Sequence, residues 1–142
     1  MKKTIARVLA VEDHPDIGDL MREALARSLI EATISTTGEE ALTRLATETY
    51  DLILLDIALP GMDGMEVCRR IKANPRLKDI PVIFVSGQTA KAYKDEAQRL
   101  GAVEYIEKPF DLLPFLSCIM GHLKLGPAGE RDMRRAWPVA VT

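Results

Sequence analysis

The sequence predicts a doubly wound α/β domain, in which helices cover both faces of a five-stranded parallel sheet. Five short apolar segments alternate along the chain with five longer segments of helical spacing, and this alternation favours parallel strands joined by right-handed crossovers. The length of 142 residues, with 47% hydrophobic and 28% charged residues, suits one domain with one core. The same composition excludes disordered, collagenous and disulfide-rich proteins.

The five apolar segments are predicted to be strands. Residues 52–55 and 82–85 are continuously apolar, as strands buried on both faces are, so we expect them in the middle of the sheet. Residues 32–35 and 103–106 include polar side chains, which is typical of strands at a sheet edge. The remaining strand is predicted over residues 5–11.

The segments between and after the strands carry helix signals. A helical spacing over residues 17–29 predicts the first helix, which starts near Pro15. The other signals are capping boxes that open at Thr37 and at Asp63, a helix end at Gly101, and a fifth helix that starts at Asp111. The pattern stops after residue 125. We therefore predict a folded domain over residues 1–125 and a flexible tail over 126–142, where Pro, Gly and scattered charges follow one another.

The charge balance and the termini exclude several classes of partner. Nineteen Lys and Arg stand against 21 Asp and Glu, so no basic excess indicates direct binding to nucleic acid or to an anionic membrane. No segment has the roughly 20 apolar residues that a membrane helix needs. The two cysteines are too few for a disulfide framework, and no signal peptide is recognised, so we expect reduced thiols and a cytoplasmic protein.

Polar side chains follow four of the predicted strands. Glu12 and Asp13 come after the first, Asp56 after the third, Ser86 after the fourth and Lys108 after the fifth. Because the ends of parallel strands meet at one edge of the sheet, where such folds bind ligands, we expect these side chains to lie close together.

This set of side chains suits phosphoryl transfer. Clustered carboxylates repel one another, and Mg²⁺, which prefers oxygen ligands, relieves that repulsion. Lys108 and Ser86 can hold an anionic group beside the metal ion. Asp56 is then placed to act as a carboxylate nucleophile, and the product would be an acyl phosphate.

The motifs resemble those of a known family, the receiver domains of two-component response regulators. The resemblance extends over residues 5–125. It implies a flavodoxin-like (CheY-like) fold with strand order 2-1-3-4-5. The motifs that carry it are Glu12-Asp13, Asp56 followed by Leu59-Pro60-Gly61-Met62-Asp63-Gly64, Val85-Ser86-Gly87 and Lys108-Pro109-Phe110.

The resemblance implies a function and a set of ligands. Asp56 would accept a phosphoryl group from a sensor histidine kinase or a histidine phosphotransfer protein, with Mg²⁺ required. Asp13 and Asp56 would bind the metal ion, Glu12 would bind it directly or through water, and the backbone carbonyl of Ala58 would complete the site. The protein would be a phosphoacceptor regulator rather than an enzyme with a separate substrate.

The resemblance also implies a conformational switch. Lys108 and Ser86 would hold the phosphoryl oxygens, and the Lys108–Pro109 bond would be cis. Ser86 would move toward the phosphoryl group while Tyr105 turns inward, which changes the surface around the fourth and fifth helices. We expect a stand-alone receiver that signals to another protein, as a monomer or as a phosphorylation-dependent dimer.

Two positions depart from the family pattern. Glu12 replaces the more common Asp and reaches one methylene further. Ala58, two residues after Asp56, offers no side chain over the phosphoryl group, so the lifetime of the phosphorylated state is an open question. His14, beside the acidic pair, is interpreted as a solvated loop residue.

Two alternatives remain. The first is an aspartyl-phosphate phosphatase of the haloacid dehalogenase type, which would use Asp56 as the same nucleophile. Such enzymes carry a second Asp where this chain has Ala58, which argues against them. The second is a receiver-like binding module that works without phosphorylation, and the presence of Asp56, Lys108 and Ser86 argues against that.

Overall fold

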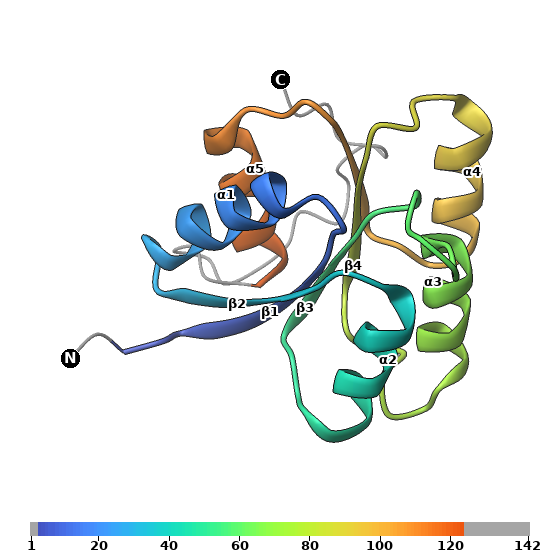
Figure 1. Cartoon of the computed structure of the whole chain (residues 1–142), viewed down its shortest axis with the longest axis horizontal. Helices are drawn as coiled ribbons and strands as arrows, with labels where there is room; N and C mark the ends of the chain where they lie inside the picture. The colour runs from blue at the N-terminus through green and yellow to red at the C-terminus, as the bar shows by residue number, and fades with distance from the viewer. Residues whose placement is uncertain (1–2, 124–142) are drawn as a thin grey trace.

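The computed structural model describes residues 3–123 and confirms the predicted doubly wound α/β fold (Figure 1). The described strands form one parallel sheet in the order β2-β1-β3-β4-β5. The strands are β1 (Ala6–Val11), β2 (Ile30–Ser35), β3 (Leu52–Leu55), β4 (Val82–Ser86) and β5 (Glu104–Glu107). The helices are α1 (Pro15–Ala26), α2 (Gly38–Thr47), α3 (Gly64–Ala73), α4 (Lys91–Arg99) and α5 (Leu112–His122).

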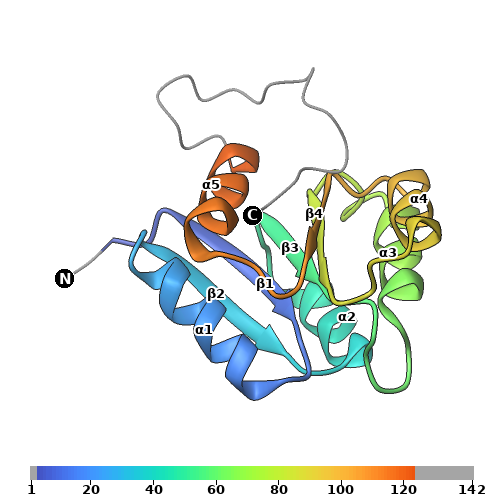
Figure 2. The same cartoon turned by 90° about the horizontal axis from the view of Figure 1, so that it is seen from above.

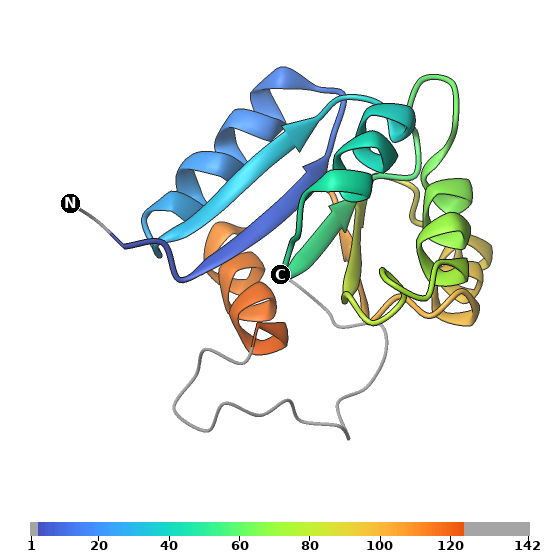
Figure 3. The same cartoon turned by 90° about the horizontal axis from the view of Figure 1, so that it is seen from below.

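The helices divide between the two faces of the sheet. Helices α1 and α5 cover one face, and α2, α3 and α4 cover the other, as the views in Figures 2 and 3 also show. Neighbouring side chains of the central strands point to opposite faces, so Val8 packs toward α1 and α5 while Leu9 packs toward α2 and α3. This alternation fixes the register, since a slip of one residue would exchange the two buried faces.

The predicted ends of the helices and strands agree closely with the structure, except where the first helix ends and the second strand begins. The prediction continues that helix to Leu29, but α1 ends at Ala26. Leu29 has a left-handed backbone (φ 62°) and its carbonyl accepts a hydrogen bond from the Ile5 N–H at 2.8 Å. The chain therefore reverses three residues early, and β2 begins at Ile30, two residues before the predicted strand.

The predicted helix caps are confirmed. The Thr37 hydroxyl accepts a hydrogen bond from the Glu40 N–H at 3.1 Å, and the Asp63 carboxylate accepts one from the Glu66 N–H at 3.0 Å. Gly101 follows α4 with φ 98°, as a glycine at a helix end does. Within the described part of the chain, no helix is long and apolar enough to cross a bilayer. The predicted tail over 126–142, and with it the domain boundary, lies outside the described residues.

The first residue of α3 packs directly against the end of β3. The Gly64 N–H donates to the Ile57 carbonyl at 2.9 Å, and a Cβ atom on Gly64 would lie 2.0 Å from the Asp56 carbonyl oxygen. We expect Gly64→Ala to lower the free energy of unfolding by about 2 kcal/mol, because backbone must shift to make room. Urea unfolding measures this.

Gly121 provides the matched control for that substitution. It lies inside α5, and a Cβ atom there would meet nothing within 4 Å. Gly121→Ala should therefore raise the free energy of unfolding by roughly 0.5–1 kcal/mol through helix propensity. A Gly64→Ala protein as stable as wild type would show that the contact with Asp56 is not tight.

Candidate functional site

The residues that follow the strands meet at the carboxyl edge of the sheet. Asp56 and Glu12 are buried, with 4% and 2% of their surface exposed. The Lys108 ammonium lies between them, because Nζ is 2.7 Å from Asp56 Oδ2 and 2.7 Å from Glu12 Oε1. One cation thus pairs with two carboxylates, which follow the neighbouring strands β1 and β3.

Backbone hydrogen bonds that continue the sheet hold these residues in place. The Glu12 N–H donates to the Ser35 carbonyl at 2.9 Å, and the Asp56 N–H donates to the Val11 carbonyl at 3.1 Å. The Lys108 N–H donates to the Ser86 carbonyl at 2.9 Å. The Lys108–Pro109 peptide bond is cis, as the resemblance implied.

The electrostatics of Lys108 follow from its two partners. Burial alone would lower its pKa, since it disfavours the charged ammonium. Hydrogen bonds and Coulomb attraction from Asp56 and Glu12 outweigh burial, so the pKa of Lys108 is raised. The ammonium is therefore charged at neutral pH.

The two carboxylates that pair with Lys108 belong to a larger acidic cluster. Glu12, Asp13, His14 and Asp56 each offer a ligand atom, and these atoms lie within 4.8 Å of one another. Three carboxylates at this separation are the oxygen donors that Mg²⁺ prefers, so the residues fit that ion. The Ala58 N–H donates to Asp56 Oδ1 at 3.2 Å, whereas the role of the Ala58 carbonyl as a metal ligand stays a prediction.

His14 is more closely tied to the acidic pair than its predicted role suggested. Its side chain is 65% exposed, in keeping with a solvated loop residue. Its Nδ1 atom nevertheless lies 3.1 Å from Glu12 Oε2 and 3.3 Å from Asp13 Oδ1. The position of His14 directly after Glu12 and Asp13 in the sequence was the signal that could have predicted this contact. The contact itself depends on the turn that leads into α1.

Ser86 and Tyr105 share a partner that the sequence did not reveal. The Ser86 hydroxyl oxygen accepts a hydrogen bond from the Gln88 N–H at 3.2 Å, and the Tyr105 hydroxyl donates to the Gln88 carbonyl. Both side chains are buried. The Tyr105 ring stacks on Phe84 with 6.0 Å between centroids. Burial raises the pKa of Tyr105 to about 12, so its hydroxyl remains a donor at neutral pH. The backbone of Gln88 thus connects the two predicted switch residues.

Comparison with known proteins points to a single family. The model of the response regulator receiver domain matches residues 8–119. The chain is 36% identical over 104 residues to the transcriptional regulatory protein YrkP of Bacillus subtilis, covering 73% of the chain and 43% of YrkP. It is 34% identical over 129 residues to the transcriptional activator IrlR of Burkholderia pseudomallei, covering 91% of the chain and 55% of IrlR.

A solved structure gives the same result. The chemotaxis response regulator CheY4 of Vibrio cholerae superimposes with a TM-score of 0.79 at 27% identity, covering 84% of this chain and 99% of that one. The chain spans about half the length of the curated relatives that it matches.

Proposed function

The chain belongs to the response regulator receiver domain family of two-component signalling, and on that basis we propose that Asp56 is its phosphoacceptor. Receiver domains act with histidine kinases and with downstream effectors. The observation that carries the assignment of Asp56 is its buried pairing with Lys108, beside Glu12 and Asp13. The phosphoryl donor we propose is a phosphohistidine on a sensor kinase or on a histidine phosphotransfer protein.

The chemistry assigns a task to each side chain. An Asp56 carboxylate oxygen attacks phosphorus, the P–N bond to the donor imidazole breaks, and the released imidazole takes up a proton. Lys108 leaves Glu12 and Asp56 to hold a phosphoryl oxygen, and the Ser86 hydroxyl donates to another. Glu12, Asp13 and Asp56 would hold Mg²⁺, with the Ala58 carbonyl as a further ligand. The bound ion would neutralise charge on the transferring group.

The switch follows from the partner that Ser86 and Tyr105 share. A Ser86 hydroxyl that turns toward a phosphoryl oxygen changes its contact with the Gln88 N–H. Gln88 also accepts the hydrogen bond from Tyr105, so movement of this backbone reaches β5. We expect the output to be contact with another protein, since a net charge of −2 provides no attraction for nucleic acid.

Ala58 should shorten the lifetime of the phosphorylated state. Ala58 is exposed, and its side chain is too small to cover a phosphoryl group on Asp56 and shield it from water. Ala58→Asn should slow the loss of phosphate, since the amide would shield the acyl phosphate. Decay after removal of the donor measures this, and equal rates in the two proteins would disprove it.

The experiment that tests the proposed function is incubation of the full chain with a small phosphodonor, followed by intact mass measurement with and without Mg²⁺. We expect the gain of a single phosphoryl group only when Mg²⁺ is present. Sustained release of phosphate from diverse small esters would favour the phosphatase alternative instead. A folded protein that gains no phosphoryl group would favour a module that works without phosphorylation.

A further inference from the structure

A second group of potential metal ligands lies between β5 and α5, far from the acidic cluster. Glu104, Cys118 and His122 each offer a ligand atom, and these atoms lie within 4.8 Å of one another. We propose that these three residues, the β5–α5 cluster, bind a divalent transition-metal ion of the Zn²⁺ class. Glu104 begins β5, so the cluster belongs to the amino edge of the sheet, whereas Asp56 lies at the carboxyl edge.

The backbone places the three side chains on one face. Cys118 and His122 are four residues apart on α5, and this spacing puts both on the same side of a helix. It is also the spacing at which two helical side chains bind one zinc ion in known metal sites. Glu104 points to the same side of β5 as Ile106, which packs in the core beneath α5. Its Oε1 atom lies 2.8 Å from His122 Nε2.

All three potential ligands are buried, and burial of the carboxylate favours a bound cation. Glu104 is 3% exposed and Cys118 is 2% exposed, and the side chain of His122 is 8% exposed. A carboxylate so far removed from water is costly unless a cation or a set of donors compensates it. A bound divalent cation would compensate the charge of the Glu104 carboxylate directly.

The donor set selects the class of metal ion. A thiolate, an imidazole nitrogen and a carboxylate suit Zn²⁺ and related ions, whereas Mg²⁺ prefers oxygen ligands alone. Ligands around a tetrahedral zinc ion are roughly 3.3–3.8 Å apart, so small side-chain rotations from the present positions suffice. Cys118 would bind as a thiolate, and its proton would pass to solvent.

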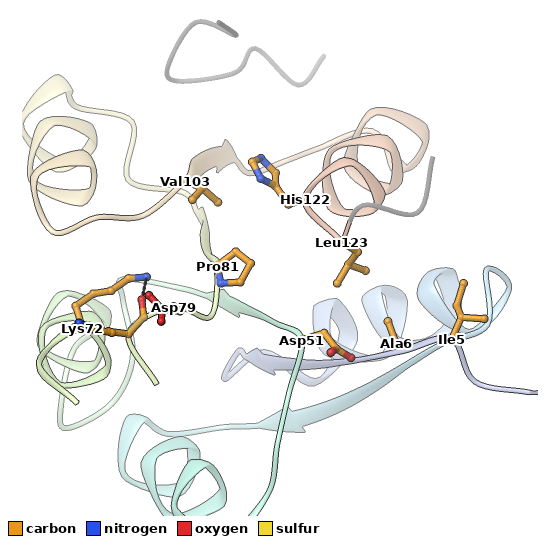
Figure 4. Close-up of a pocket in the computed structure, with 10 residues that line it drawn as sticks. Ile5, Ala6, Asp51, Lys72, Asp79, Pro81, Val103, His122 and Leu123 are labelled. Carbon is orange, nitrogen blue, oxygen red and sulfur yellow. Dashed lines mark hydrogen bonds between the residues drawn. The ribbon is translucent and has the colours of Figure 1, made fainter. Parts of the chain in front are cut away.

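An open depression borders the cluster at His122 (Figure 4). It has a volume of about 470 Å³ and is lined by His122, Val103 and Pro81, with Lys72 and Asp79 on another side. Water in this depression can supply the fourth ligand that three protein ligands leave open. The bound ion would tie the start of β5, next to Tyr105, to the last turns of α5.

The other cysteine provides a matched control. Cys68 is also fully buried, but it lies on α3 and packs against the opposite face of the sheet. Burial raises its pKa to about 11. Cys68 belongs to no group of potential metal ligands among residues 3–123, so Cys68→Ser should leave metal binding unchanged.

The test is titration of the untagged, reduced, metal-free full chain with Co²⁺ in excess Mg²⁺. We expect a single equivalent of Co²⁺ to bind with near-ultraviolet absorption from sulfur-to-cobalt charge transfer, and Zn²⁺ to displace it. Cys118→Ser should abolish that absorption and weaken binding by at least about tenfold, since loss of even an outer-shell partner costs that much. Cys68→Ser should retain both.

Two further variants keep the outcome decisive. His122→Gln should also weaken Co²⁺ binding. It replaces Cys118→Ser as the test variant if circular dichroism shows that Cys118→Ser is unfolded. Asp13→Asn alters only the acidic cluster and should leave the charge-transfer absorption intact.

Absence of that absorption in the wild-type protein, or its survival in Cys118→Ser, would overturn the proposal. So would loss of Co²⁺ binding in Asp13→Asn alone. Phosphoryl uptake by Cys118→Ser and His122→Gln is a separate readout of the proposed function, because neither residue belongs to the acidic cluster.

Discussion

Asp56→Asn is expected to abolish phosphoryl uptake while leaving the protein folded. The amide has nearly the same shape as the carboxylate, and its one oxygen can still accept a hydrogen bond from Lys108, although the Ala58 N–H, which bonds the other carboxylate oxygen, then loses its acceptor. It lacks the anionic oxygen that attacks phosphorus, so no acyl phosphate can form. Intact mass measurement after incubation with Mg²⁺ and a small phosphodonor should show no added phosphoryl group.

Asp63→Asn is the matched control for that result. Asp63 lies seven residues later and caps α3, and Asn caps a helix as well as Asp does. This variant should take up phosphate at the wild-type rate. Labelling of Asp56→Asn to the wild-type level would contradict the assignment of Asp56 as the acceptor.

Lys108→Met is expected to lower the free energy of unfolding by about 3 kcal/mol in magnesium-free buffer, because it leaves two buried carboxylates without their shared cation. The pKa of Lys108 is raised in the folded state, so its contribution is complete below the ordinary lysine pKa of about 10.4 and is lost only as pH rises through the folded value. The decrease in the free energy of unfolding caused by Lys108→Met should therefore be the same at pH 7 and pH 8. Mg²⁺ should reverse part of that decrease, since the ion can replace the missing charge.

Lys91→Met controls for removal of a lysine in general. Lys91 forms an ion pair with Asp95 on the surface of α4, and its side chain is 87% exposed. This substitution should change the free energy of unfolding by less than about 0.5 kcal/mol. Urea unfolding of both variants, with and without Mg²⁺, measures these effects. A Lys108→Met protein as stable as the Lys91→Met protein would show that the buried ion pair does not stabilise the fold.

Much of the fold could be predicted because its signals are local. Continuous apolar segments, capping residues and the glycine after α4 each act within a few residues of where they stand. The convergence of Asp56, Lys108 and Glu12 was also predictable, since parallel strands must end at one edge of the sheet. The early end of α1 was not, because Leu29 adopts a backbone conformation that its side chain does not favour.

Contacts between side chains of different elements were harder to predict. Glu104 is one of the polar residues that predicted an edge strand, and the structure buries it against His122. That contact depends on how α5 is rotated over the sheet, and no local pattern specifies the rotation. The connection of Ser86 and Tyr105 through Gln88 is similar, because it uses backbone atoms that every residue possesses.

The most direct test of the account is to locate the modified residue chemically. The full chain is incubated with a phosphodonor and Mg²⁺, treated with borohydride to reduce any acyl phosphate to an alcohol, and digested for peptide mass spectrometry. We predict that reduction converts the residue at position 56 to homoserine, and only in samples that contained Mg²⁺. A reduced residue at another aspartate, or equal conversion of residue 56 without a divalent cation, would contradict a magnesium-dependent phosphoacceptor at Asp56.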